Sequence, residues 1–394
     1  MERATLQAAL ALALAAAVSL GTARFAYALL LPPMRADLGW SYFTAGAMNT
    51  VNAAGYLAGA LLLPRLLRRL DARAVMLAGG GAAALLLALH GATRIDALLF
   101  VLRAASGVAS AASFVGGGLL AARLASTVPA RAGQVLGLYY GGTGLGIVVS
   151  ALAVPPLVAL DSGAWAGAWG ALGGLSLLAT AATATGTKSL AAPPAPGAAR
   201  VPLALRPFAF GLLAYGCFGL GYIGYMTFIV TLLREQGLPG GLVIAFYVLL
   251  GLAVMASSFI WAALLQRHRN GRPLATLNAL LAAATLLPVL SAQPLAVFAS
   301  GLLFGGVFLS VVASTTALVR HNAEPAAWAS GIAAFTIVFA GGQIVGPALA
   351  GLIADGPGGL QRALAWSAGA LALGAVLAMA QKAVDPRPVP LTRS

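Results

Sequence analysis

The stretch "SLGTARFAYALLLPPMRADLGWS", Ser19 to Ser41, decides the fold because it places one charge inside an apolar run. With the apolar residues before it, the run is long enough to cross a bilayer, which takes about 20 residues. Arg24 lies inside the run. A charged residue at membrane depth costs about 3 kcal/mol or more, and it usually faces a partner or a water-filled cavity. We therefore predict a membrane-spanning helix that carries a functional arginine.

The composition supports a membrane protein throughout. Of the 394 residues, 60% are hydrophobic and 8% are charged, whereas soluble domains have roughly 45–50% apolar and about 25% charged residues. The single cysteine, Cys217, excludes an internal disulfide and a cysteine metal cluster. The N-terminus resembles a secretory signal, but further apolar runs follow it, so the first helix is expected to be retained. We expect no cofactor and no metal.

The apolar runs predict an all-α integral membrane protein with twelve membrane-spanning helices. An even number of spans places both termini on one side of the membrane. The predicted spans cover residues 7–33, 43–64, 74–92, 96–121, 132–157, 164–186, 207–233, 241–265, 274–292, 294–319, 327–353 and 361–382.

The basic residues predict the orientation of these spans. Loops on the side of the two termini carry seventeen Arg and Lys residues, whereas the opposite loops carry Arg35, Arg94, Arg234 and Arg362. Loops rich in basic residues stay in the cytoplasm, so both termini are predicted to be cytoplasmic. The formal net charge of +14 then reflects topology, and we expect the lipid bilayer rather than nucleic acid as a partner.

The segment "TKSLAAPPAPGAARVPLALRP", residues 187–207, is the one long Pro-rich break, and it lies at the middle of the chain. We interpret residues 187–206 as a cytoplasmic linker. It would join an N-terminal six-helix bundle, residues 1–186, to a C-terminal six-helix bundle with a short tail, residues 207–394.

The two halves also repeat each other. At an offset of 198 residues Gly21 matches Gly219 and Tyr27 matches Tyr225, and at an offset of 200 Gly146 matches Gly346. Parallel repeats of this kind build transporters whose site lies at the repeat interface near the middle of the membrane. The pattern predicts two six-helix repeats around a central cavity.

The loop between the second and third spans, "ALLLPRLLRR", resembles the loop motif of the major facilitator superfamily, Gly-x-x-x-Asp-Arg-x-Gly-Arg-Arg. It retains three basic positions of the motif, and the matching loop of the second half, "LQRHRNGRP", retains two basic positions and one glycine. Pro64 and His268 occupy the Asp positions and cannot supply that carboxylate in a gating network. The retained gating residues are Arg65, Arg68, Arg69, Arg269, Gly271 and Arg272.

The fourth span carries Arg103 and Gly107 in the spacing Arg-x-x-x-Gly, which also resembles the superfamily. The stretch "GTARFAYALLLPPMRADLGWS" is similar to the first helix of its bacterial YbfB-type branch, which implies a bacterial inner membrane. The resemblance covers nearly the whole chain. It implies that helices 1, 4, 7 and 10 line a central cavity, and that Arg24 and Arg103 are on cavity helices of one half.

No Asp or Glu falls deep in a predicted span, so Arg24 and Arg103 are the deep charges. Two guanidiniums without a carboxylate partner form a pocket that attracts anions, and their geometry suits a carboxylate. The remaining candidate substrate contacts are Tyr27, Tyr222, Tyr225 and Gln343. Alternatives stay open: Arg103 braces helices or takes part in gating by bonding backbone carbonyls, Arg24 is structural or extends to the membrane surface, and the other four pack helices.

These observations favour a secondary active transporter that moves a small organic anion, a carboxylate, by alternating access. We expect a monomer, and no catalytic motif indicates an enzyme. The alternative is an efflux transporter for neutral lipophilic drugs or metabolites; a sensor or scaffold lacks an output element. Without a deep acid, either the proton travels with the substrate, or an anion is exchanged, or transport is uncoupled.

Overall fold

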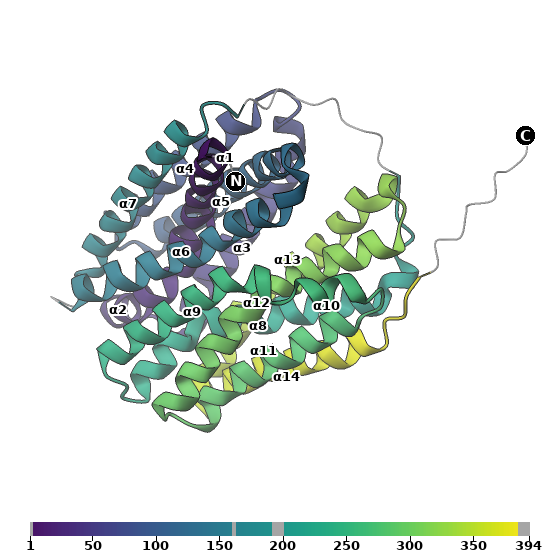
Figure 1. The fold of residues 1–394 in the computed structure, drawn as a ribbon. Helices are drawn as coiled ribbons and strands as arrows, with labels where there is room; N and C mark the ends of the chain where they lie inside the picture. The colour runs from purple at the N-terminus through teal and green to yellow at the C-terminus, as the bar shows by residue number, and fades with distance from the viewer. Residues whose placement is uncertain (1–2, 160–162, 191–200, 385–394) are drawn as a thin grey trace, which may run out of the picture.

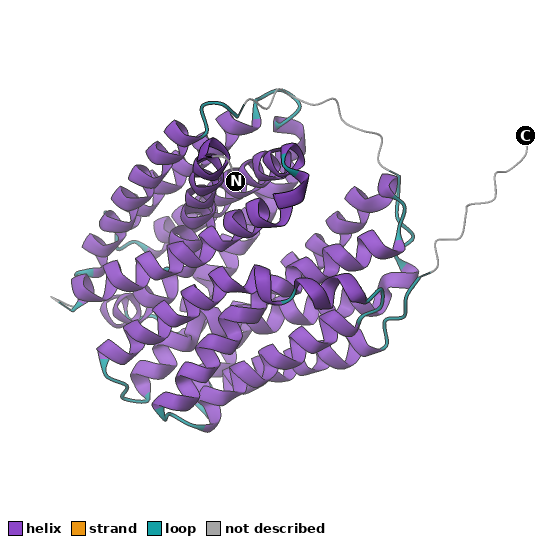
Figure 2. Ribbon diagram, viewed as in Figure 1, coloured by secondary structure: helices purple, strands orange, loops and turns teal. Residues whose placement is uncertain are grey.

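The computed structural model describes residues 3–159, 163–190 and 201–384 (Figure 1). Within these ranges the chain is helical and contains no β-strand (Figure 2). The predicted linker, residues 187–206, lies outside the described residues over 191–200, as does the end of the predicted tail over 385–394.

The first apolar run forms one long segment in three pieces: α1 (Arg3–Ala16), the π-helix η1 (Ala17–Phe25) and α2 (Tyr27–Leu38). Gly39 ends α2 in the left-handed conformation, with φ of 65°, which glycine adopts without strain. Five further helices follow before the middle of the chain: α3 (Tyr42–Leu66), α4 (Ala72–His90), α5 (Asp96–Thr127), α6 (Ala132–Val158) and α7 (Trp165–Gly186).

The second half of the chain forms α8 (Ala209–Glu235), α9 (Gly240–Ile260), α10 (Ala262–Arg267), α11 (Arg272–Leu290), α12 (Pro294–Asn322), α13 (Trp328–Ala354) and α14 (Gly359–Met379). The predicted single span 241–265 is therefore interrupted at Trp261, between α9 and α10. The indole nitrogen of Trp261 donates a hydrogen bond to the Gly306 carbonyl, 2.7 Å away. We call the end at which α7 ends and α8 begins the linker end, and the opposite end the far end.

Ten helical segments of the described chain are long and apolar enough to cross a membrane, the first being Arg3–Leu38. Helices α3 and α7 are not among the ten. The outer surface is also apolar: Leu178, Leu290 and Leu295 are 68%, 73% and 81% exposed. Large exposed apolar surfaces are unfavourable in water and suit lipid contact. The chain is a multi-pass membrane protein.

The helices of residues 3–186 pack on one another, and so do those of residues 206–379 (Figure 1). The two groups meet along α3 with α13 and along α6 with α9. Glycines allow this close approach. A Cβ atom at Gly46 would lie 2.1 Å from the Pro347 carbonyl oxygen, and one at Gly144 would lie 2.3 Å from the Gly251 carbonyl oxygen.

The π-helix η1 has a local cause in its polar residues and its neighbour. The hydroxyl groups of Ser19 and Thr22 donate to the carbonyls of Ala16 and Val18, which competes with the regular ladder. Gly21 packs directly on α6, where a Cβ atom would lie 2.4 Å from the Gly146 Cα. π-helical turns often occur at functional sites, and Arg24 lies in the last turn of this one.

We predict that Gly142→Ala destabilises the protein. The added methyl group would lie 2.0 Å from the Ala13 carbonyl oxygen of α1, so α6 must move away. Overpacking of this kind costs about 1–3 kcal/mol, which would lower the apparent Tm of the detergent-purified protein. The control is Gly170→Ala in α7, where no atom lies within 4 Å of the new methyl group. It should leave Tm unchanged or raise it, and equal Tm values for the two variants would contradict this packing.

Candidate functional site

Three of the predicted site residues form one hydrogen-bonded chain between the two groups of helices. Arg24 Nη2 donates to Gln343 Oε1 of α13, 2.9 Å away. Gln343 Nε2 in turn donates to the Tyr222 hydroxyl of α8. The three side chains are 4%, 4% and 3% exposed. The sequence positions are far apart, and the contact between η1, α8 and α13 brings them together. We call Arg24, Gln343 and Tyr222 the arginine relay.

The guanidinium of Arg24 retains donor capacity. Its buried Nε has no hydrogen-bond partner in the structure. Its Cζ lies 5.8 Å from the ring centroid of Tyr56 and 6.0 Å from that of Phe25, so aromatic faces border the charge. No Asp or Glu belongs to the buried part of the described chain. The charge of Arg24 is therefore not neutralised by a buried acid there.

Arg103 of α5 is 1% exposed, and it is bound by protein oxygens. Its guanidinium donates to the Ala23 carbonyl at 3.3 Å, to the Met48 carbonyl at 3.5 Å and to Asn49 Oδ1 at 3.1 Å. Its Cζ lies 4.5 Å from the ring centroid of Tyr27. Arg103 thus ties α5 to η1 and α3, as the bracing alternative describes. Its contact with a substrate stays a prediction.

The other two predicted tyrosines donate or share hydrogen bonds outside the arginine relay. The Tyr27 hydroxyl donates to the Ala45 carbonyl, 2.9 Å away. The Tyr225 hydroxyl lies 2.7 Å from Ser300 Oγ of α12. Both rings are buried. Tyr27 contacts Arg103, which in turn donates to the carbonyl of the residue before Arg24. Tyr225 instead faces α12.

A group of aromatic rings surrounds Tyr222. Its ring stacks with Phe218 at 4.7 Å, with Phe339 at 5.6 Å and with Phe308 at 6.0 Å. Phe308 also meets Phe25 edge to face, at 5.8 Å. Tyr56, Phe308 and Phe339 were not predicted as site residues from the sequence. The spacing of Phe218 and Tyr222, four residues apart on one helix, is a signal, but the partner rings come from other helices.

The far end of the molecule is closed by polar contacts between the groups. The Asp355 carboxylate, at the end of α13, accepts hydrogen bonds from the backbone amides of Tyr42 and Phe43, at 2.8 Å and 2.9 Å. A carboxylate is favoured at this position because a helix N-terminus is partly positive. The Tyr42 hydroxyl donates to Glu235 at the end of α8, and the guanidinium of Arg35 lies 3.7 Å from the Tyr42 ring centroid.

Nearer the linker end, Tyr140 of α6 is an exposed aromatic residue beside both groups. Its neighbour Tyr139 donates to the Phe114 carbonyl of α5, and its other neighbour Gly141 faces Met255 of α9. Successive residues of a helix are rotated by about 100°, so Tyr140 points between α5 and α9. It is nevertheless 40% exposed.

The predicted gating residues lie at the linker end, in two loops and the helix ends beside them. The side chains of Arg65, Arg68, Arg69, Arg269 and Arg272 are exposed. Gly271 is buried, and a Cβ atom there would lie 2.0 Å from the Ala378 carbonyl oxygen of α14. The close approach of α14 therefore requires glycine at this position. Their roles in gating stay a prediction.

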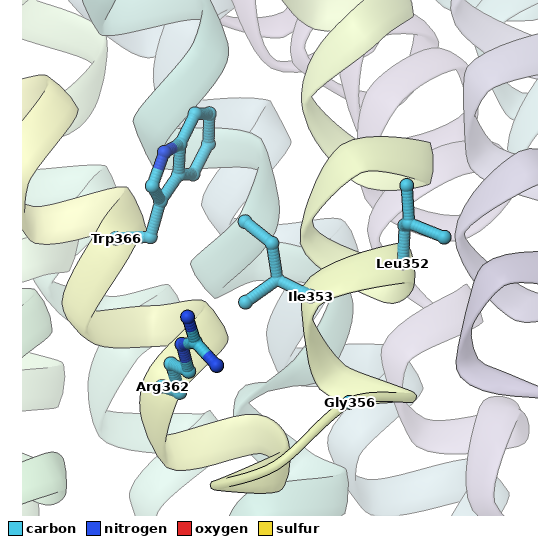
Figure 3. Close-up of a pocket in the computed structure, with 5 residues that line it drawn as sticks. All are labelled: Leu352, Ile353, Gly356, Arg362 and Trp366. Carbon is cyan, nitrogen blue, oxygen red and sulfur yellow. The ribbon is translucent and has the colours of Figure 1, made fainter.

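A separate cavity of about 250 Å³ lies between α13 and α14 at the far end. Figure 3 shows Trp366 and Arg362 on α14, with Ile353 opposite them on α13. It shares no residue with the arginine relay. Arg362 is exposed and donates to the Pro357 carbonyl, 3.3 Å away, so it mainly stabilises the loop. Across the described residues, no group of three His, Cys, Asp or Glu could hold a metal ion.

Comparison with solved structures identifies the fold. The nucleoside transporter NupG, as its D323A mutant, matches with a TM-score of 0.74 at 15% identity, over 96% of this chain and 100% of that one. A bacterial homologue of the human lysosomal transporter Spinster, in an inward-facing and unoccupied conformation, matches with a TM-score of 0.66 at 13% identity, over 97% and 96%. The human organic anion transporter MFSD10 (TETRAN) gives 0.63 at 15%, over 95% and 97%.

A search of curated protein sequences gave no match. The profile of the family described as "Uncharacterised MFS-type transporter YbfB" matches residues 16–379. The match includes the arginine relay and the helices from η1 to α14. The chain therefore belongs to the YbfB-type family of major facilitator transporters, and it is a transporter rather than an enzyme.

Proposed function

We propose that the chain is a secondary active transporter that moves a small organic anion, through its carboxylate, by alternating access. One observation carries this proposal: Arg24 is buried at the junction of the two groups without an acidic partner among the described residues, and its Nε is unpartnered. An uncompensated buried charge is unfavourable. A substrate carboxylate would supply the missing charge.

The arginine relay suggests how binding is linked to movement. A carboxylate can accept two parallel hydrogen bonds from a guanidinium, whereas the Gln343 amide oxygen accepts one bond from Nη2 here. A substrate that accepts from Nε and Nη2 would displace Gln343. That exchange removes a direct bond between the two groups of helices, so binding would favour their relative motion.

Arg103 and Tyr27 would position the segment that carries Arg24. Arg103 donates to the Ala23 carbonyl, which directly precedes Arg24, and its guanidinium lies over the Tyr27 ring. Asn49 connects Arg103 to the second group, since its Nδ2 donates to Thr227 Oγ1 at 2.7 Å. In this proposal Arg103 holds η1 in place and Arg24 contacts the substrate.

We also propose the finer architecture: twelve spans as two six-helix repeats, residues 1–186 and 207–394, joined by the linker 187–206. Matched glycines support the repeat. Gly146 packs on Gly21 in the first half, and its match Gly346 packs on Leu220, next to Gly219, in the second. The charge asymmetry of the loops supports cytoplasmic termini, and we propose a bacterial inner membrane as the location. We also propose that the transporter is a monomer.

Alternating access requires one end to close while the other is open. The Asp355 contacts at the far end and the exposed Tyr140 nearer the linker end support a state that is open toward the linker end. No buried acid in the described chain could carry a coupling proton. Three coupling modes fit this: the proton travels with the substrate, an anion is exchanged, or transport is uncoupled.

We predict that Arg24→Ala lowers carboxylate affinity about 10- to 100-fold, because it removes charge-assisted hydrogen bonds. Gln343→Glu should also inhibit binding, because the new carboxylate would pair with Arg24 and compete with the substrate. Binding is measured by thermal shift and uptake by proteoliposome assays. The control is Arg362→Ala, an exposed arginine outside the relay.

Wild-type carboxylate uptake by Arg24→Ala would contradict the proposal. Stabilisation of the wild-type protein by neutral lipophilic compounds alone, with no response to carboxylates, would instead support the alternative of lipophile efflux. Each variant must elute as a folded, monodisperse protein for these comparisons.

We predict that Asp355→Asn opens the far end. The substitution removes the charge at the N-terminus of α3, an interaction worth about 0.3–1 kcal/mol, so opening should become about two- to fivefold more frequent. A cysteine placed at Thr50, in a Cys217→Ser background, reports opening through its labelling rate with a membrane-impermeant maleimide. Thr50 is suitable because it lies where the two groups meet: its hydroxyl donates a hydrogen bond to the Ile344 carbonyl of α13, 2.6 Å away.

The matched control is Asp96→Asn. Asp96 accepts a hydrogen bond from Trp40 within the first group, 2.8 Å away, and does not bridge the groups. It should leave the labelling rate unchanged. Equal labelling in both variants would show that Asp355 does not hold the far end closed.

A further inference from the structure

We infer that the substrate is a small monocarboxylate whose carboxylate is attached to a planar aromatic ring. This inference rests on the proposed anion function and makes it more specific. It follows from two features of the site: one buried guanidinium with free donor capacity, and a set of nearly parallel aromatic rings beside it.

The charges of the site indicate one negative charge on the substrate. Among the described residues, Arg24 and Arg103 are the buried Arg and Lys side chains. Arg103 already donates to Ala23, Met48 and Asn49. One guanidinium therefore remains for a ligand. A second carboxylate would be buried without a partner, which is strongly unfavourable.

The rings around Tyr222 form layers. Their planes lie within 21° for Phe218, 20° for Phe339 and 11° for Phe308, and Phe218 and Phe339 are within 8° of each other. A flat aromatic ring can extend such layers at the centroid spacing of about 4.5–7 Å that aromatic pairs prefer. A puckered saturated ring has no π face and cannot stack in this way.

The layered rings and the guanidinium belong to one site. Tyr222 is the last member of the arginine relay, and Phe308 contacts both Tyr222 and Phe25. Phe25 follows Arg24 in the chain and lies beside its guanidinium. A ligand that places its carboxylate on Arg24 therefore has its ring next to the stack.

One ring of the stack is partly exposed. Of the four rings Phe218, Tyr222, Phe308 and Phe339, the first three are buried and Phe339 is partly exposed. Tyr56, whose ring lies by Arg24, is also partly exposed. Both the charged end and the flat part of a ligand therefore meet accessible aromatic surface.

The test compares four ligands of similar size on the purified full-length protein by calorimetric titration: benzoate, cyclohexanecarboxylate, terephthalate and benzamide. We expect benzoate to bind about 3- to 10-fold more tightly than cyclohexanecarboxylate, as expected for one aromatic stacking contact. Terephthalate, with two carboxylates, and neutral benzamide should bind more weakly than benzoate.

The outcomes separate this inference from the proposed function. Equal affinity for benzoate and cyclohexanecarboxylate, or tighter binding of terephthalate, would overturn the aromatic or the single-charge part while leaving anion transport in place. Benzamide binding as tightly as benzoate would overturn the proposed function itself. The absence of binding by all four ligands would overturn the aromatic monocarboxylate.

A substitution at Phe339 tests whether the ligand ring stacks on this side chain. Phe339→Leu should weaken benzoate binding about 3- to 10-fold, by loss of the stacking contact, and leave cyclohexanecarboxylate binding unchanged. A merely structural effect would weaken both ligands equally. The control is Phe335→Leu on the same helix, which contacts Phe208 and Tyr215 rather than Tyr222 and should change neither affinity.

Discussion

The structure depends on a buried guanidinium that no acidic side chain of the described residues neutralises. Arg24 is 4% exposed, and it donates to an amide oxygen rather than to a carboxylate. In a medium of low dielectric constant such a charge is tolerated through hydrogen bonds and aromatic faces, or through a mobile anion. Gln343, Tyr56 and Phe25 provide the first two. The third is the role that we propose for the substrate.

Close helix packing makes this arrangement possible. Gly21 lets η1 approach α6, and Gly46 lets α3 approach α13, so that backbones meet almost directly. Contacts of this kind leave little room for gradual change, because a packed interface shifts between distinct arrangements. Polar links across the groups, from Asn49 to Thr227 and from Asp355 to the start of α3, can then be exchanged as the groups move.

Much of the fold could be predicted from the sequence. The family resemblance is confirmed by the match over residues 16–379, and the membrane class follows from apolar runs that the structure forms as helices. The interruption at Trp261 was not predicted, because hydropathy continues across it. The twelve-span repeat remains a prediction, since α3 and α7 are less apolar than the ten candidate spans. The contacts of Phe308 and Phe339 with Tyr222 could not be predicted either, because these residues are far from Tyr222 in the sequence.

The sequence by itself determined that the chain lies in lipid, because its long apolar runs are stable only there. It also determined that Arg24 needs a partner, because a charge within such a run is unfavourable alone. It could not determine which partner. The tertiary structure decided that Arg24 meets Gln343, 319 positions away, and that Arg103 is held by backbone carbonyls and Asn49. The physical reason is that hydrogen bonding depends on distances of a few tenths of an ångström. Those distances depend on the π-helical register of η1 and on how the helices pack.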